Sequence, residues 1–189
     1  YNFYYKKRFM KKFVAIVQAR LTSKRFPEKV IQKIGNFTII EIILERLKKS
    51  KLIDEIVFSI PSNTKNNKLY EHLKTLKTNV FRGSEYNVLD RYFKTAKQFR
   101  ATDIIRITGD CPLVDSIIID EMISIYLKKK TDFLNNNLPP NNSDGFDVEI
   151  FSFNSLKLAN KKAVFSFDRE HVSPYIERSK KFKKENIKS

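Results

Sequence analysis

Four basic or hydroxyl side chains follow the first apolar segment of the chain, in the stretch VAIVQARLTSKRFPEK. They are Arg20, Ser23, Arg25 and Lys29. Arginine forms paired hydrogen bonds with phosphate oxygens, and lysine supplies a mobile positive charge. A serine hydroxyl and backbone N–H groups would complete a cradle for a polyphosphate. The alternative is an exposed turn whose charges are simply solvated.

A second chemical group lies in the segment RITGDCPLVD. Asp110 follows an apolar run and Gly109. A carboxylate there could hold Mg²⁺, which takes few protein ligands and several phosphate oxygens. A turn or capping aspartate is the alternative. We expect Asp115 to cap the next helix, and Cys111 to be a packed residue without a base beside it.

The segment SDGFDVEIF contributes further acids. Asp147 and Glu149 are two residues apart in a strand pattern, so their side chains should point to one face. Paired carboxylates could bind sugar hydroxyls or a metal, and an exposed face of an edge strand is the alternative. The sequence has two histidines, His72 and His171, and neither has a metal-ligand partner at a useful spacing. No Walker loop or dinucleotide-binding glycine pattern occurs.

The elements that must position these groups alternate between short apolar strands and amphipathic helices. Strands are predicted over 13–19, 55–60, 79–81 and 103–108, and helices over 38–49, 87–99 and 116–128. This order predicts a three-layer α/β fold with a mostly parallel sheet. Ligands of such sheets bind beyond the carboxyl ends of the strands, where the basic stretch and Asp110 fall.

Glycine is scarce, with four in 189 residues, so we expect it where the backbone requires it. Gly35 falls in a predicted turn. The other three, Gly83, Gly109 and Gly145, lie beside predicted strands and close to acids. The loops that contain them are therefore candidate site loops.

Composition narrows the class of protein. The chain is 41% hydrophobic and long enough for one domain with a sizeable core. No apolar run reaches the roughly 18 residues of a membrane span, and a single cysteine excludes an internal disulfide. We therefore expect a cytoplasmic protein that does not bind membranes.

The net charge of +16 raises the possibility of a basic nucleic-acid-binding module. Residues 1–9 carry +3 of this charge and residues 178–189 carry +5. The aromatic residues of 87–99 fall on a predicted core stripe rather than among exposed basic groups. Nucleic acid is therefore the weaker alternative as a partner.

Five segments in order carry a resemblance to a known family: QARLTSKRFPEKV, FRGSEYNVLDRYF, RITGDCPLVD, DGFDVEIFSF and REHVSPYI. Together they resemble the cytidylyltransferases, which include the acylneuraminate and 3-deoxy-manno-octulosonate enzymes, and most of all the spore coat polysaccharide biosynthesis protein F type. The resemblance implies a nucleotide-diphospho-sugar transferase fold. It also implies transfer of CMP from CTP to a sugar or sugar acid, for surface polysaccharide or glycan biosynthesis. A further implication is a homodimer whose subunits share the sugar side of the site, with 132–165 as the contributing segment.

The same resemblance implies roles for individual residues. It assigns the nucleotide phosphates to Arg20, Ser23, Arg25 and Lys29, and the nucleotide site also to Arg82 and Gly83. It assigns Mg²⁺ to Asp110, catalysis to Arg20, Lys29 and Asp110, and the sugar side to Asp144, Asp147 and Glu149. A glycosyltransferase of the same fold, acting on a nucleotide sugar, is the alternative within the enzyme class.

Two positions depart from the family pattern, and the end of the chain raises a third question. Thr22 stands where the family often has glycine, and would be strained if φ there must be positive. Glu28 replaces the glycine of a frequent PGK and puts an acid beside Lys29. We expect 1–9 to be a leader or read-through, 10–178 the domain and 179–189 a solvated charged tail. A final strand and helix, with a second Mg²⁺ ligand, would be missing, leaving the chain truncated and weakly active.

Overall fold

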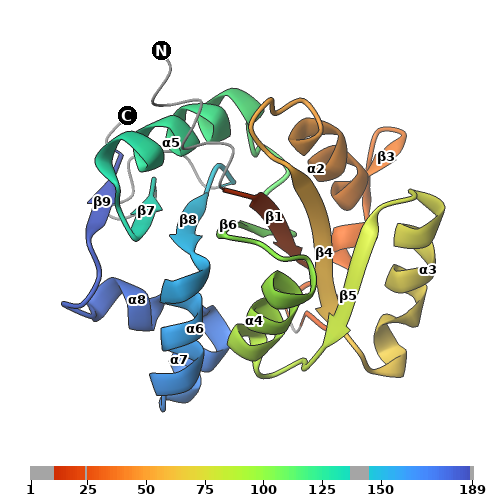
Figure 1. Cartoon of the computed structure of the whole chain (residues 1–189). Helices are drawn as coiled ribbons and strands as arrows, with labels where there is room; N and C mark the ends of the chain where they lie inside the picture. The colour runs from red at the N-terminus through yellow and green to blue at the C-terminus, as the bar shows by residue number, and fades with distance from the viewer. Residues whose placement is uncertain (1–10, 24, 137–144, 188–189) are drawn as a thin grey trace.

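The computed structural model describes residues 11–23, 25–136 and 145–187, which form a three-layer α/β fold (Figure 1). A seven-stranded sheet lies in the middle, with the strand order β5-β4-β1-β6-β8-β7-β9. The strands are β1 (Phe13–Gln18), β4 (Glu55–Pro61), β5 (Asn79–Gly83), β6 (Asp103–Thr108), β7 (Phe133–Asn135), β8 (Glu149–Ser152) and β9 (Lys184–Asn186).

Strand β1 is the centre of the sheet because it is apolar on both faces. All residues from Phe13 to Val17 are buried. The strand pairs in parallel with β4 on one side and with β6 on the other. Only β8 runs against its neighbours β6 and β7, so the sheet is mostly parallel. A run of β-branched and apolar residues without alternation is what a parallel strand covered on both faces requires.

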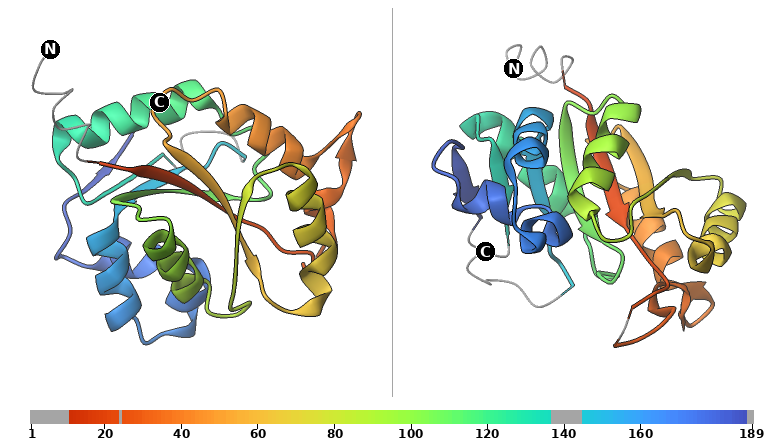
Figure 2. Two further views of the ribbon diagram at one scale, coloured as in Figure 1. Left: turned by 45° about the vertical axis from the view of Figure 1, so that its right-hand side comes forward. Right: turned by 90° about the horizontal axis from the view of Figure 1, so that it is seen from below.

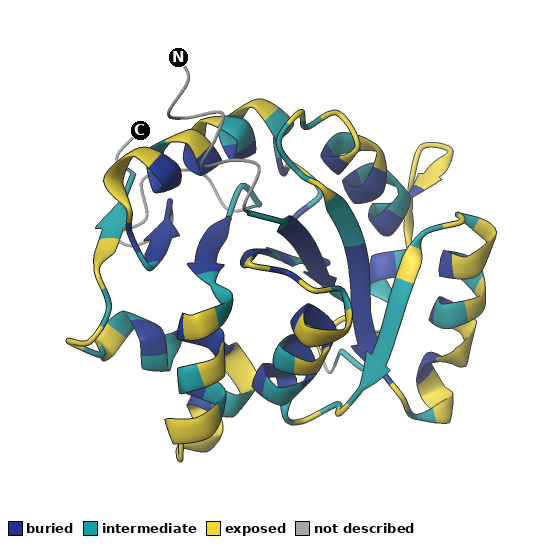
Figure 3. Ribbon diagram, viewed as in Figure 1, coloured by how far each residue is buried: buried dark blue, intermediate teal, exposed yellow. Residues whose placement is uncertain are grey.

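Helices cover both faces of the sheet (Figure 2). One face carries α2 (Ile39–Leu47), α3 (Asn67–Thr75) and α5 (Ser116–Lys129), and the other carries α4 (Val88–Gln98), α6 (Phe153–Lys162), α7 (Ser166–His171) and α8 (Pro174–Arg178). A small hairpin of β2 (Lys33–Ile34) and β3 (Phe37–Thr38) precedes α2. Burial follows this layering, since the central strands are buried and the outer helix faces are exposed (Figure 3). No helix among the described residues is long and apolar enough to span a membrane.

Local signals in the sequence set the helix starts. Thr38 caps α2, and the Glu41 carboxylate accepts a hydrogen bond from the Thr38 backbone N–H, which completes a capping box. Asn87 caps α4 through the N–H of Asp90 at 3.1 Å, and Asp115 caps α5 through the N–H of Ile117 at 2.8 Å. The predicted strands and helices, and the capping role of Asp115, are therefore confirmed with boundaries shifted by at most two residues.

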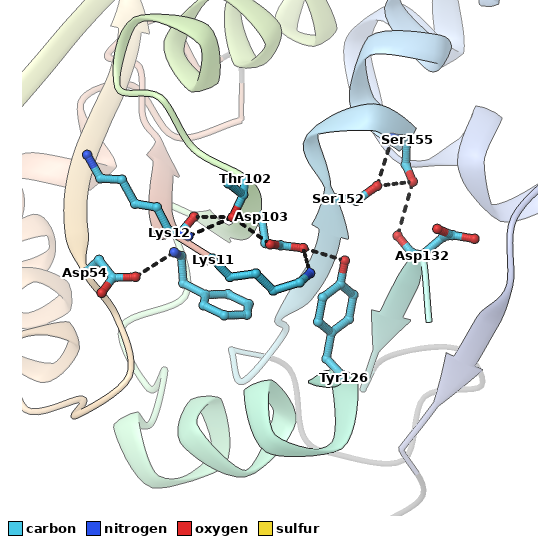
Figure 4. Close-up of polar contacts among 10 residues, drawn as sticks. Lys11, Lys12, Asp54, Thr102, Asp103, Tyr126, Asp132, Ser152 and Ser155 are labelled. Atoms are coloured by element: carbon cyan, nitrogen blue, oxygen red, sulfur yellow. Dashed lines mark hydrogen bonds and ion pairs between the residues drawn. The ribbon is translucent and has the colours of Figure 1, made fainter. Parts of the chain in front are cut away.

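The amino ends of the central strands hold a buried polar cluster (Figure 4). The carboxylate of Asp103 accepts hydrogen bonds from Lys11 Nζ at 2.7 Å and from the Tyr126 hydroxyl at 2.8 Å. Burial and the neighbouring Asp103 charge raise the pKa of Tyr126. Asp54 accepts from the N–H of Phe13 at 2.7 Å and so ties the loop before β4 to the start of β1. This cluster is structural and lies at the edge of the sheet opposite the predicted site.

The lysine-rich segment near residue 184 differs from the expected solvated tail. Lys184–Asn186 form β9, which pairs in parallel with β7 at the edge of the sheet. The N–H of Ile187 donates to the carbonyl of Asn135 at 2.9 Å, and Glu185 pairs with Lys129 at 2.8 Å. These residues are therefore part of the sheet, because strand pairing satisfies their backbone groups while the side chains of Lys183 and Lys184 stay exposed.

Candidate functional site

The predicted basic stretch forms a loop, residues 19–29, at the carboxyl end of β1; we call it the phosphate loop. Buried Leu21 anchors it. The N–H of Leu21 donates to Asn66 Oδ1 at 2.8 Å, and the N–H of Glu28 donates to the carbonyl of Leu21 at 2.9 Å. This second bond folds the loop back on itself, so that Lys29, at the start of the short 3-10 helix Lys29–Ile31, lies near the strand end.

Lys29 and Asp110 meet across the carboxyl ends of β1 and β6. Nζ of Lys29 lies 2.6 Å from Oδ2 of Asp110, whose side chain is 45% exposed. Gly109 makes this approach possible, because its N–H donates to the Gln18 carbonyl at 2.7 Å and a Cβ there would lie 2.8 Å from that oxygen. Burial alone would raise the pKa of Asp110, but hydrogen bonds from Lys29 and Thr108 outweigh it and hold the pKa below its usual value.

The remaining groups of the phosphate loop are accessible. Arg20 and Arg25 are exposed and form no ion pair within the described part of the chain. The hydroxyl of Ser23 is 3.5 Å from the N–H of Phe26, too long to hold it firmly. Arg20 lines a cleft of about 600 Å³ between the start of α4 and α7. The cleft is lined by Arg20, Glu85, Tyr86, Asn87, Ser166, Arg169 and Glu170. The structure thus leaves three loop groups available to an anion.

Backbone strain falls on Glu28 and not on Thr22. Glu28 has φ 56° and ψ 15°, in the left-handed region that favours glycine, and Thr22 is not among the residues with positive φ. The positive φ is needed where the loop turns into the 3-10 helix. The Glu28 carboxylate pairs with Lys68 at 2.7 Å, away from Lys29. The suspected strain at Thr22 is therefore absent, and the acid beside Lys29 is already neutralised by another lysine.

Arg82 and Gly83 lie at the end of β5, beside the phosphate loop. The Arg82 guanidinium donates to the carbonyls of Ser62 and Asn63, both at 3.1 Å, and to Asn67 Oδ1 at 2.7 Å. It therefore ties the loop after β4 to β5. A Cβ on Gly83 would lie 2.9 Å from the Arg91 side chain. Both residues thus hold β5 against its neighbours, and their contact with a nucleotide stays a prediction.

Arg91 is a buried cation that the sequence analysis missed. Its guanidinium donates to the carbonyl of Ser84, and its Nε has no hydrogen-bond partner among the described residues. Burial, reinforced by the nearby charge of Arg20, lowers the pKa of Arg91 to about 10, while Tyr92 and Glu85 act in the opposite direction. The only sequence signal was a charged residue on the apolar stripe of a predicted helix.

The acidic segment before β8 divides into separate environments. Asp144 lies outside the described residues. Asp147 is half-buried and close enough to Cys111 for its charge to act on the thiol. Burial, reinforced by Asp110 and Asp147, raises the pKa of Cys111, which is buried and bonded to Thr108 at 2.9 Å. Cys111 is thus a packed residue as predicted, and Asp147 lies on the same side of the sheet edge as Asp110.

Glu149 lies inside the protein, because β8 is an inner strand rather than an edge strand. Its Oε1 is 3.0 Å from Arg106 of β6 and accepts a hydrogen bond from Ser173 at 3.1 Å. Its buried Oε2 has no hydrogen-bond partner among the described residues. Ser173 is held by a tight turn at Val172, where φ is 73° and ψ is −61°. The alternative of an exposed strand face is therefore wrong for Glu149.

The histidines lie elsewhere. His72 faces the hydroxyl of Thr38 at 3.2 Å, and His171 is exposed against the ring of Phe167. Among the described residues no three acids, cysteines or histidines gather into a metal site. The exposed Asp110 carboxylate nevertheless suits a hard cation that takes its other ligands from phosphate and water.

Most of the chain is similar in sequence to known proteins. The model of the family described as Cytidylyltransferase matches residues 14–187. The uncharacterized protein MJ1063 of Methanocaldococcus jannaschii is 42% identical over 165 residues, covering 87% of this chain and 67% of that protein. The spore coat polysaccharide biosynthesis protein SpsF of Bacillus subtilis is 31% identical over 175 residues, covering 88% and 70%.

Solved structures resemble the whole fold. A cytidylyltransferase from Leptospira borgpetersenii superposes with a TM-score of 0.90 at 35% identity, covering 95% of this chain and 76% of that one. A CMP:2-keto-3-deoxy-manno-octonic acid synthetase complexed with CTP superposes with a TM-score of 0.71 at 11% identity, covering 94% and 90%. At that identity the second likeness bears on the fold alone. It supports the predicted nucleotide-diphospho-sugar transferase fold.

Proposed function

Because the chain belongs to the cytidylyltransferase family, we propose that it transfers CMP from CTP to an oxygen of a sugar or sugar acid and releases pyrophosphate. The observation that carries the proposal is the placement of Lys29 and Asp110 at the carboxyl ends of two adjacent strands, 2.6 Å apart, beside the exposed Arg20 and Arg25. A triphosphate and its cation need such a set of opposite charges at one sheet edge.

In the proposed reaction an acceptor oxygen attacks the α-phosphorus, the bond from that phosphorus to the bridging oxygen breaks, and pyrophosphate leaves with the electron pair of that bond. An acceptor hydroxyl would give up its proton to water. Arg20, Arg25 and Lys29 would bind the phosphate oxygens and stabilise the charge that develops on them. Asp110 would hold Mg²⁺, which neutralises phosphate charge when bound. The residues position and stabilise, so no protein nucleophile is required.

The acceptor would lie on the β8 side of the site. Asp147 supports this placement because it lies near Asp110 and Cys111 at the same sheet edge. Glu149 is buried, so its influence on the acceptor would be indirect, through its ion pair with Arg106. Like SpsF of Bacillus subtilis, a relative named for polysaccharide synthesis, the enzyme would serve the synthesis of a surface glycan.

A second copy of the chain is the proposed partner. The turn between α6 and α7, together with the first residues of α7, exposes three apolar side chains: Val164 by 81%, Phe165 by 63% and Phe167 by 59%. Such a cluster is typical of an interaction surface. It adjoins the cleft, which Ser166, Arg169 and Glu170 line. A homodimer formed here would bring the partner close to the proposed acceptor side.

The test is pyrophosphate release from a panel of nucleoside triphosphates, each combined with a panel of sugars and sugar acids at saturating Mg²⁺. We expect release with CTP and a sugar or sugar acid. The rate of pyrophosphate release by Lys29→Ala should be at least about 100-fold lower than that of the wild type, because removal of one charge-stabilising donor often has an effect of this size. Lys157→Ala, on the exposed face of α6, is the matched control and should keep full activity. Equal activity of both variants, or transfer from a finished nucleotide sugar with release of a nucleoside phosphate and no pyrophosphate, would refute the proposal.

A further inference from the structure

Four side chains and one main-chain group form a continuous series of hydrogen bonds that begins and ends on the phosphate loop. The N–H of Leu21 donates to Asn66 Oδ1 at 2.8 Å, and Asn66 Nδ2 donates to Asn63 Oδ1 at 2.8 Å. Asn63 Nδ2 donates to one carboxylate oxygen of Glu85, and the Thr22 hydroxyl donates to the other. We call this series the Glu85 clamp.

The direction of the bonds from Leu21 to residue 85 follows from the first donor. A main-chain N–H can only donate, so the fully buried Asn66 must present its oxygen to Leu21 and its nitrogen to Asn63. Asn63 then presents its own nitrogen to residue 85. That position therefore has to accept, and a carboxylate can accept on both oxygens at once.

The clamp joins the ends of three strands. Asn63 and Asn66 follow β4, Glu85 follows β5, and Leu21 and Thr22 follow β1. It fixes Leu21 and Thr22, the two residues directly after Arg20. The clamp therefore sets the position from which the Arg20 side chain enters the cleft, which Glu85 also lines. Arg20 itself has no ion pair within the described residues that would set its position.

We infer that Glu85 is a positioning residue, which holds the phosphate loop in the shape that receives the nucleotide phosphates. The inference rests on the proposed function for the identity of the ligand. The rival role for Glu85 is electrostatic, since its charge also acts on the buried Arg91 beside Arg20. The two roles differ in whether hydrogen bonds or net charge must be kept.

Three variants separate these roles. Glu85→Ala removes both acceptors. Glu85→Gln removes the charge but keeps the clamp, because its oxygen can accept from Asn63 while its nitrogen donates to the Thr22 hydroxyl, which can also accept. Thr22→Val removes only the link between Glu85 and the loop. Glu71→Ala, on the exposed face of α3, is the control.

The first readout needs no nucleotide: the rate at which trypsin cleaves the native full chain after Arg20 and Arg25. The second is the KM for CTP and the kcat of pyrophosphate release. For Glu85→Ala we expect the rate of trypsin cleavage and the KM for CTP each to rise by roughly 10-fold, because Asn63 and Thr22 lose their acceptor. The change in kcat should be smaller. Thr22→Val should fall between Glu85→Ala and the wild type. Glu85→Gln and the control should stay within about twofold of the wild type.

Unchanged cleavage in Glu85→Ala would overturn the inference. Equal loss in Glu85→Gln and Glu85→Ala would also overturn it, in favour of the electrostatic role. Faster cleavage of Glu85→Ala in a protein that releases no pyrophosphate from any nucleotide would refute the proposed function but support the clamp. The failure of one claim can thus be told from the failure of the other.

Discussion

The ammonium of Lys29 forms an ion pair with the carboxylate of Asp110, with 2.6 Å between Nζ and Oδ2. The carboxylate that is expected to bind a cation is therefore already paired with a cation of the protein. A triphosphate would attract Lys29 toward its own oxygens and leave Asp110 free for Mg²⁺. Nucleotide and metal binding should therefore favour one another, because both require the same pair to separate.

The first prediction concerns this exchange. Lys29→Met should bind Mn²⁺ more tightly than the wild type in the absence of nucleotide, measured by electron paramagnetic resonance, because Asp110 has lost its competing cation. The same variant should lose at least about 100-fold in CTP turnover. Unchanged or weaker Mn²⁺ binding would show that the pair does not compete with the metal.

Asp110→Asn is the complementary change. It should abolish the response of turnover to Mg²⁺ while the thermal unfolding midpoint hardly moves, because a partly exposed ion pair contributes only about 0–1 kcal/mol. Circular dichroism melting checks the fold, and a magnesium titration of activity checks the role. An Asn variant with normal magnesium dependence would remove Asp110 as a ligand.

Glu28 offers a test of backbone strain. Glu28→Gly and Glu28→Ala both lose the ion pair with Lys68, but only glycine relieves the left-handed conformation. We expect the glycine variant to unfold with a free energy about 0.5–1 kcal/mol higher than that of the alanine variant. Urea denaturation measures the difference. If alanine were as stable as glycine at this position, the strain would not be real.

Glu177 gives a prediction about pH. Burial raises its pKa, as does the like charge of Glu149, and these effects outweigh a hydrogen bond from Ser173 and the charges of Arg106 and Arg178. A carboxyl with a raised folded pKa contributes most stability below its ordinary pKa, near 4.3, and loses it as pH rises through the folded value.

Glu177→Gln should therefore melt at the same temperature as the wild type near pH 4 and at a higher temperature near pH 8. Glu121→Gln, exposed on α5, serves as the control and should show no such trend. If the difference in melting temperature between Glu177→Gln and the wild type were constant with pH, or became smaller as pH rises, the raised pKa of Glu177 would be contradicted.

The apolar cluster of Val164, Phe165 and Phe167 predicts a dimer. Light scattering at micromolar concentration should give twice the chain mass for the wild type, and the chain mass for Phe167→Asp, because a charge in an apolar interface is left unpaired. Phe37→Asp is a matched control, since Phe37 is 57% exposed in the hairpin away from this cluster. Two outcomes would contradict this surface: a monomeric wild type, or loss of the dimer in the Phe37 variant.

Sequence reasoning succeeded where the signal is local. The apolar runs of β1, β4 and β6, the stripe of α4 and the cap at Asp115 are all set by neighbours within a few residues. The strand order then places the basic loop and Asp110 at one edge, since carboxyl ends of parallel strands coincide. This much of the site followed from pattern and topology.

What escaped prediction depends on contacts between distant segments. Strand β9 is too short and too charged to show a pattern, and it forms because β7 offers unpaired backbone groups. The burial of Glu149 requires Arg106 and Ser173, which come from two other segments. Glu85 stands in a segment that resembles the family, yet its two partners follow other strands. No window of sequence contains these pairs.

The central position of β1 has a consequence for the order in which the protein folds. Val14 pairs with Glu55 and Phe13 pairs with Asp103. The first strand to be synthesised therefore waits for strand partners that are synthesised much later. Folds dominated by such non-local pairing reach the native state slowly. The phosphate loop acquires its shape only when both halves of the sheet have docked on β1. A ligand that bridges these loops would therefore bind the native state alone and add to its stability by mass action.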